Sequence, residues 1–167
     1  MSHWIYKGEP FDPLYEDIDD AGFVYIIHNT LYRRKYVGKK RFHQKRRLKP
    51  LKGKKRGRIK ITESDWREYT GSSEFLNADI ERLGKQHFVF EIVSFHPNYT
   101  EVNYHELRLQ MILNVLEERD AAGDRIYYNR NIVRKFYPSA LHLQHRADIN
   151  EEYHDFKSSI SKEYSNS

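Results

Sequence analysis

The sequence predicts an α+β fold in which a small three-stranded antiparallel sheet is flanked by helices. Two short aromatic and β-branched runs stand on either side of a brief polar turn, and a third run of the same kind follows further along the chain. Two other stretches space their apolar residues as helices do. With 167 residues, of which 38% are hydrophobic and 32% charged, the chain is long enough for one domain with a true core.

The strands are expected in three places. Residues 1–21 are predicted to be an extended N-terminal arm, because two prolines disfavour helix there and acidic residues gather toward its end. Strands are predicted at 22–29 and 35–39, and the short connection between them indicates an antiparallel hairpin. The third strand is expected at 88–95.

Three helical stretches are expected between and after the strands. The basic residues 40–48 are compatible with a first helix, and 49–62 are expected to be an exposed loop because a proline and two glycines interrupt any helix. A second helix is predicted between an N-cap at Ser73 and a stop at Gly84. The longest helical pattern covers 100–119.

Positive charge is concentrated in one segment. Residues 39–60 contain 13 Lys and Arg and no Asp or Glu, whereas the other 16 basic residues face 24 acidic ones, a net charge of −8. One basic segment on an acidic protein is typical of polyanion binding. A solvated charged loop is the simpler alternative, and the segment lacks the apolar face of a membrane-surface helix.

Several classes of protein are excluded by composition. The chain has no cysteine, which excludes disulfide scaffolds, thiolate metal sites and cysteine nucleophiles and fits a reducing compartment. No apolar run is long enough to span a membrane and no signal-peptide pattern is present, so we expect a cytoplasmic protein without a membrane partner. His142 and His145 have a metal-ligand spacing, but without further placed ligands we interpret them as surface residues.

Two tyrosines and one glutamate suggest a chemical site. Tyr25 and Tyr36 lie eleven apart on the predicted hairpin, so a symmetric turn would place them directly opposite each other on one face; an ordinary aromatic pair is the alternative. Glu106 interrupts the apolar stripe of the long helix. A carboxylate in that position needs a cation, and either a divalent metal with several waters or an arginine would satisfy it.

These features together resemble a known family. The runs Phe23-Val24-Tyr25 and Tyr36-Val37-Gly38 resemble the two halves of the GIY-YIG nuclease motif, at the usual tyrosine spacing and with phage-like residues between them. The resemblance extends from about Gly22 to Ile132 and includes Tyr69 to Ser73, Glu106 on the long helix and the pair Tyr128-Asn129. It places a nuclease domain at 22–132, a basic insertion at 49–60 and a polar C-terminal extension at 133–167. Phe23, where the family usually has glycine, is a departure, and so is the insertion.

The resemblance implies a metal-dependent endonuclease of the phage homing or free-standing type. Its implied catalytic residues are Tyr25, Tyr36, Arg46 on the first helix, Tyr69, Glu106 and Asn129, with Arg41 or Arg47 replacing Arg46 if the helix register differs. Glu106 would bind one Mg²⁺, for which Mn²⁺ would substitute.

The residue types suggest how such a site would work. Tyr25 is the expected general base, with its phenol pKa lowered by neighbouring cations, and Tyr36, Tyr69 or a metal-bound hydroxide is the alternative. Tyr36 would orient that phenol or the water, and Arg46 would hold the phosphate oxygens.

The basic segment is expected to supply affinity for the substrate. The residues expected to contact nucleic acid are Lys39, Lys40, Arg41, Lys45, Arg47, Lys52, Lys54, Lys55, Arg56 and Arg58. The expected partner is double-stranded DNA, cut by a monomer in two events or by a homodimer. A structured RNA substrate and a non-catalytic binding module of the same fold remain the alternatives.

Overall fold

A computed structural model describes residues 1–50, 52–53 and 55–132 of the chain. Its strands are β1 (Trp4–Tyr6), β2 (Glu9–Pro10), β3 (Gly22–Asn29), β4 (Arg34–Arg41), β5 (His43–Leu48), β6 (Arg58–Glu63) and β7 (Phe88–His96). Its helices are α1 (Glu74–Leu83) and α2 (Tyr99–Ile112), with short 3-10 turns at Tyr15–Asp17 and Lys85–His87. The fold is α+β, as the sequence predicts.

The main sheet has five strands in the order β2-β1-β7-β3-β4. Its centre is the predicted antiparallel set β7-β3-β4. Part of the predicted extended arm at 1–21 belongs to this sheet, because β1 pairs parallel to β7 and the Trp4 side chain is fully buried. Trp4 also donates its indole N–H to the Trp66 carbonyl at 2.6 Å, which ties the N-terminus to the loop before α1.

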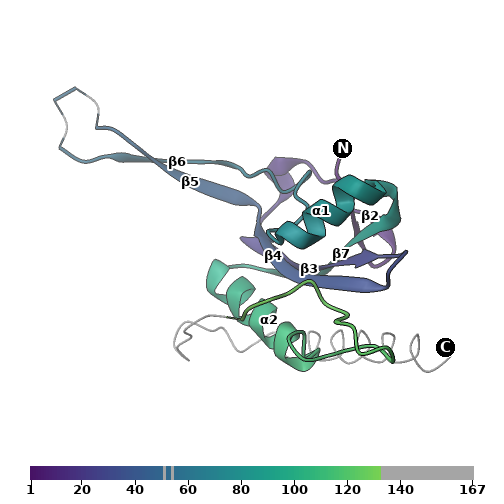
Figure 1. The fold of residues 1–167 in the computed structure, drawn as a ribbon. Helices are drawn as coiled ribbons and strands as arrows, with labels where there is room; N and C mark the ends of the chain where they lie inside the picture. Colours follow the sequence, from purple (N-terminus) through teal and green to yellow (C-terminus); the bar gives the residue numbers. More distant parts are fainter. Residues whose placement is uncertain (51, 54, 133–167) are drawn as a thin grey trace.

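α1 and α2 cover opposite faces of this sheet (Figure 1), and a separate core lies on each face. Strand residues alternate between them, so Val24, Ile26 and Val37 pack under α2, whereas the aromatic residues of β3 and β7 face α1. The second core is almost entirely aromatic; its rings come from Trp4, Phe23, Tyr25, Tyr36, Phe42, Trp66, Phe88, Phe90 and Tyr128.

The predicted helix at 40–48 is wrong, and the loop predicted at 49–62 gives way to a strand from Arg58 onward. β4 runs to Arg41, Phe42 is anchored in the aromatic core, and β5 and β6 then form a separate antiparallel ribbon. The ribbon projects from the body of the molecule (Figure 1). The overlooked signal is the β-branched set Ile59, Ile61 and Thr62 on β6, which favours a strand over a loop.

The other helix boundaries follow the sequence more closely. The Ser73 hydroxyl caps α1 by accepting from the Leu76 N–H, and the helix ends at Gly84 with φ near 92°, both as predicted. α2 ends at Ile112 rather than near 119. Asn114 adopts a left-handed conformation with φ 48°, which turns the chain and buries Val115.

Candidate active site

The two motif tyrosines lie on one face of the β3–β4 hairpin, but not opposite each other. The register pairs Tyr25 with Gly38 and Ile27 with Tyr36, so the predicted direct pairing is wrong by two residues. A shift of two keeps both side chains on the same face. The ring centroids are 6.2 Å apart, which makes the two phenols diagonal neighbours.

Tyr25 is buried against Gly38. Its side chain is only 1% exposed, and a Cβ built on Gly38 would lie 2.5 Å from the Tyr25 Cζ and 2.9 Å from the Tyr36 Cε1. The strand therefore needs glycine at position 38 so that the tyrosine ring can lie across it. Burial raises the pKa of the Tyr25 phenol well above its ordinary value, and the neighbouring Tyr36, Tyr69 and Glu106 raise it further. The expected lowering of this pKa by cations is absent from the described part of the chain.

Three tyrosine hydroxyls and one serine share a local network. The Tyr36 hydroxyl is 2.9 Å from the Ser72 Oγ, and the Tyr69 hydroxyl interacts with both Tyr25 and Ser72. Burial raises the pKa of Tyr36, while its bond to Ser72 partly offsets that rise. Tyr69 thus lies beside Tyr25 and Tyr36, as the sequence resemblance implies, and Ser72 is a member that sequence reasoning missed.

Glu106 lies on the α2 side of the same sheet edge and pairs with Lys39. The Lys39 ammonium contacts the Glu106 carboxylate, and each side chain is 13% exposed. This outcome resembles the alternative in which an arginine neutralises the glutamate, except that the cation is a lysine from β4. A pair with this little exposure interacts more strongly than a surface pair, since water screens it less.

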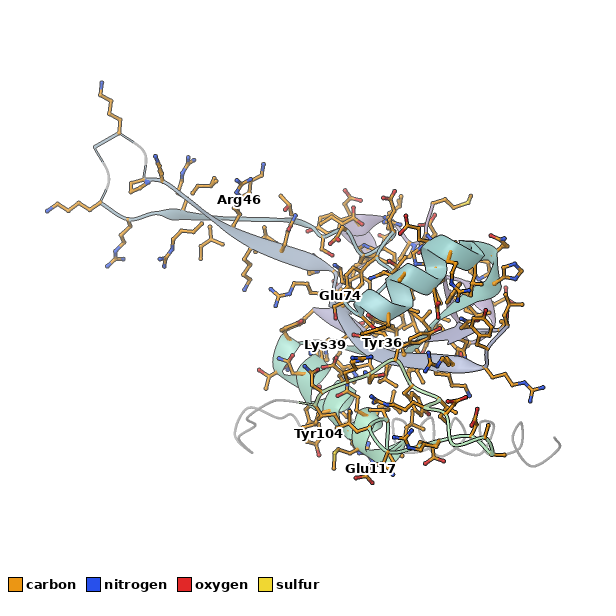
Figure 2. All side chains as sticks on the ribbon, in the orientation of Figure 1. Tyr36, Lys39, Arg46, Glu74, Tyr104 and Glu117 are labelled. Carbon is orange, nitrogen blue, oxygen red and sulfur yellow. The ribbon has the colours of Figure 1, made fainter. Side chains whose placement is uncertain are left out.

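The tyrosine face and the α2 face meet at a cleft beside β4. The cleft has a volume of about 560 Å³. It is lined by Tyr36, Lys39, Ser72, Ser73, Glu74, Phe75, Glu106, Leu107, Gln110, Tyr128, Asn129, Arg130 and Asn131. Tyr36, Lys39 and Glu74 lie close together there (Figure 2). The N-terminus of α1 also opens on this cleft through Ser73, which favours a bound anion.

Arg46 does not reach this cleft. It lies on β5, exposed and out along the ribbon, whereas Tyr36 and Lys39 lie in the body of the molecule (Figure 2). Its placement on a first helix was wrong because no helix forms there. Arg47 also lies on the ribbon, and Arg41 covers the Tyr99 ring at 4.0 Å from its centroid. The cations that line the cleft are Lys39 and Arg130.

Asn129 clamps the edge of the sheet. Its Oδ1 accepts from the Val37 N–H at 2.9 Å and its Nδ2 donates to the Val37 carbonyl at 2.7 Å. β4 is an edge strand, and the Asn129 side chain satisfies the backbone groups that pairing would otherwise satisfy. Asn129 lines the cleft, but its amide oxygen and nitrogen both bond to the backbone of Val37, on the strand that carries Tyr36.

The residues expected to contact nucleic acid fall into two groups. Lys39, Lys40 and Arg41 are on β4, and Lys40 lies 3.5 Å above the Tyr69 ring while pairing with Asp65. The others belong to the ribbon: Lys45, Arg47 and Arg58 on its strands, and Lys52, Lys55 and Arg56 in its connection. Lys54 lies outside the described residues, as does the extension 133–167 with His142 and His145.

Comparison with known proteins identifies the family. Residues 4–132 match the family model described as "Putative endonuclease segE, GIY-YIG domain", so the chain belongs to the GIY-YIG endonuclease family. The match begins at Trp4, in agreement with the place of β1 in the sheet. This family indicates a nuclease, that is, a hydrolase with a nucleic-acid substrate.

No match is found among the curated proteins or among the solved structures. Within the described residues, no helix is long and apolar enough to cross a membrane.

Proposed function

We propose that the protein is a metal-dependent endonuclease that hydrolyses DNA phosphodiester bonds in the cleft beside β4. One observation carries the proposal: a phenol, an ammonium and a carboxylate, from Tyr36, Lys39 and Glu106, converge on that cleft from both faces of the sheet. Phosphodiester hydrolysis needs a proton acceptor for water and compensation of charge on the phosphate. The cleft contains groups for both tasks.

The cleft residues fit a magnesium ion. Glu106 presents a carboxylate whose partner, Lys39, is a flexible side chain that can turn to a phosphate oxygen, and the hydroxyl of Ser72 adds a neutral oxygen donor nearby. Mg²⁺ takes one or two carboxylates and keeps several waters, so a cleft of about 560 Å³ accommodates it together with a phosphate. When bound to Glu106, Mg²⁺, or Mn²⁺ in its place, would neutralise charge on the scissile phosphate.

Tyr36 is the best placed proton acceptor. Its hydroxyl lies at the cleft, bonded to Ser72, whereas the Tyr25 hydroxyl is enclosed by Gly38 and Tyr69. Tyr25 then acts as a positioning residue that holds the hydroxyl network in place. Burial keeps both phenols protonated at neutral pH, so a water proton passes to the small deprotonated fraction of Tyr36.

Lys39 and Arg130 take the phosphate-binding role that the sequence resemblance gave to Arg46. Both line the cleft, and Arg130 lies 3.6 Å above the ring of Phe75 on its rim. The positive end of α1 adds a partial charge on the same side. These groups stabilise the phosphate without requiring the ribbon.

The β5–β6 ribbon supports duplex DNA as the substrate. Register pairs Arg46 with Lys60 and Leu48 with Arg58 on one face, and places Lys45 and Arg47 on the other. A two-stranded ribbon fits the major groove of B-form DNA, which is about 12 Å wide, whereas the corresponding groove of duplex RNA is too narrow. One cleft per chain cuts one strand at a time, so a double-strand break needs a second copy or a second event.

The test is cleavage of supercoiled plasmid DNA with Mg²⁺ by the wild type and by Glu106→Gln. We expect the variant to lose at least about 100-fold in rate while it still binds DNA and melts as the wild type does. Glu117→Gln is the matched control, because Glu117 is exposed beyond the end of α2 and does not line the cleft. Equal nicking by Glu106→Gln and the wild type would contradict the assignment of Glu106. If the wild type does not cleave DNA, the alternative of a non-catalytic nucleic-acid-binding module would be favoured. If it cleaves duplex RNA faster than DNA, RNA would be the substrate.

A further inference from the structure

Three buried ligand-type side chains lie together at the other end of α2. His96 ends β7, and Glu101 and His105 are one helical turn apart at the beginning of α2. Each is less than 8% exposed, and one potential ligand atom from each lies within 4.8 Å of the others. Glu106 points instead toward Lys39, so this cluster is separate from the cleft.

The carboxylate of Glu101 has no cationic side chain against it in the described part of the chain. It is 3% exposed and accepts a hydrogen bond from the Asn98 amide at 2.7 Å. A second acid, Asp20, lies in the same region, because the N–H of the next residue, Ala21, donates to the His96 carbonyl. Burial raises the pKa of Asp20, and the neighbouring Asp19 and Glu101 raise it further. A buried carboxylate next to another acid requires a positive partner, and a bound metal ion is one that proteins use.

The groups around the cluster orient it as metal ligands are oriented. The Ser94 Oγ lies 2.9 Å from the His96 Nε2, which leaves the Nδ1 of that ring to coordinate. The Asn98 amide holds the Oε1 of Glu101, which leaves the Oε2. Hydrogen bonds of this kind fix the tautomer and direction of metal ligands. The His96 and His105 rings are parallel with centroids 4.3 Å apart. Since the bond to Ser94 holds the His96 ring, the His105 ring must turn about its Cβ–Cγ bond for one of its nitrogens to meet an ion at the His96 Nδ1.

We infer that His96, Glu101 and His105 bind a structural transition-metal ion of the Zn²⁺ class, with a water as the fourth ligand. Two imidazoles and carboxylate oxygens form a set that suits Zn²⁺ and not Mg²⁺, which prefers oxygen ligands alone. The ion would join the end of β7 to the first turns of α2. It would thereby fix the helix that carries Glu106.

Zinc content after refolding tests this inference. The full chain is unfolded with a chelator, refolded with or without ZnCl₂, freed of loose metal and assayed for bound zinc. We expect one equivalent of Zn²⁺ per chain and a melting temperature raised by roughly 5 to 10 °C at a hundredfold excess over Kd. Refolding with Co²⁺ should give the visible absorption of a four-coordinate site. Wild type without stoichiometric zinc, or without a rise in melting temperature, overturns the inference.

Matched variants locate the ion. Glu101→Gln retains the helix-capping geometry and removes the charge, so it and His105→Gln should each lower the zinc affinity at least about tenfold. Glu106→Gln should keep the zinc, which separates this site from the cleft whether or not the protein cleaves DNA. Unchanged zinc content in both cluster variants overturns the assignment. Loss of zinc from a His142→Gln/His145→Gln double variant would move the site to the C-terminal extension.

Discussion

Replacing Gly38 with alanine is the sharpest test of the site geometry. The added Cβ would lie 2.5 Å from the Tyr25 Cζ, closer still to its hydroxyl, and 2.9 Å from the Tyr36 Cε1. Ordinary contact requires 3.4 Å or more, so the Tyr25 ring must move by about 1 Å. Trp4, with its ring centroid 4.8 Å away, and Tyr69, at 6.3 Å, close that space.

The expected effect has two parts. Overpacking of this kind costs about 1 to 3 kcal/mol of unfolding free energy, which urea titration followed by fluorescence of the two buried tryptophans measures. A displacement of about 1 Å in the hydroxyl network is expected to reduce turnover of a duplex DNA substrate roughly 100-fold. DNA affinity should remain, because the ribbon is untouched.

A double-variant cycle separates the clash from other effects of the alanine. In a Tyr25→Leu background the Tyr25 ring is absent, so Gly38→Ala should cost clearly less than in the wild type, and the remaining cost comes from the contact with the Tyr36 ring. Gly38 is not among the glycines with a positive φ, so alanine brings no left-handed backbone strain there and the cost reports the clash. Additive losses in the cycle, or a fully active and stable Gly38→Ala protein, would refute the packing of Tyr25 on Gly38.

Three further predictions concern the proton acceptor, the ribbon and buried His96. Because burial raises the Tyr36 pKa above its ordinary value near 10, the logarithm of the cleavage rate should rise with pH from 7 to 9 without a plateau. Tyr36→Phe should abolish most turnover. A plateau near neutral pH would exclude this phenol as the base. Arg46 and Lys60 face each other across the ribbon, and the double variant Arg46→Ser/Lys60→Ser should reduce the steepness of log affinity against log salt by about 1.8. The cleavage rate at saturating DNA should not change. An unchanged slope would show that the ribbon does not contact phosphates. Burial and the neighbouring His105 lower the pKa of His96 to about 3, below its unfolded value near 6.5. The unfolded state then binds a proton that the folded state does not. In the metal-free protein the contribution of buried His96 to the free energy of unfolding should be fully present above pH 6.5. It should decrease by up to about 1.4 kcal/mol per pH unit as the pH falls toward 3. His96→Gln should flatten that slope in urea titrations at pH 4 to 7, and an equal slope in both proteins would contradict it.

Sequence patterns could predict the local elements because their signals are local. The aromatic and β-branched runs in 22–29 and 88–95, the cap at Ser73 and the stop at Gly84 depend on neighbours in the chain, and each is confirmed. The two tyrosines could be placed on one face for the same reason, since side chains alternate along a strand. Their register could not, because the turn that sets it was assumed to be symmetric about the wrong pair of residues.

The amino-acid sequence by itself thus determined the α+β class, the nuclease motif and the concentration of positive charge, because spacing and composition carry them. Only the tertiary structure decided which cation lies in the cleft. Lysine and arginine fit a helix or an exposed strand alike, so residues 40–48 by themselves did not indicate that pairing with β6 would move Arg46 out along a ribbon and leave Lys39 against Glu106. The residues His96, Glu101 and His105 lie within ten positions of one another, but their burial and their meeting depend on how α2 packs back beside the end of β7.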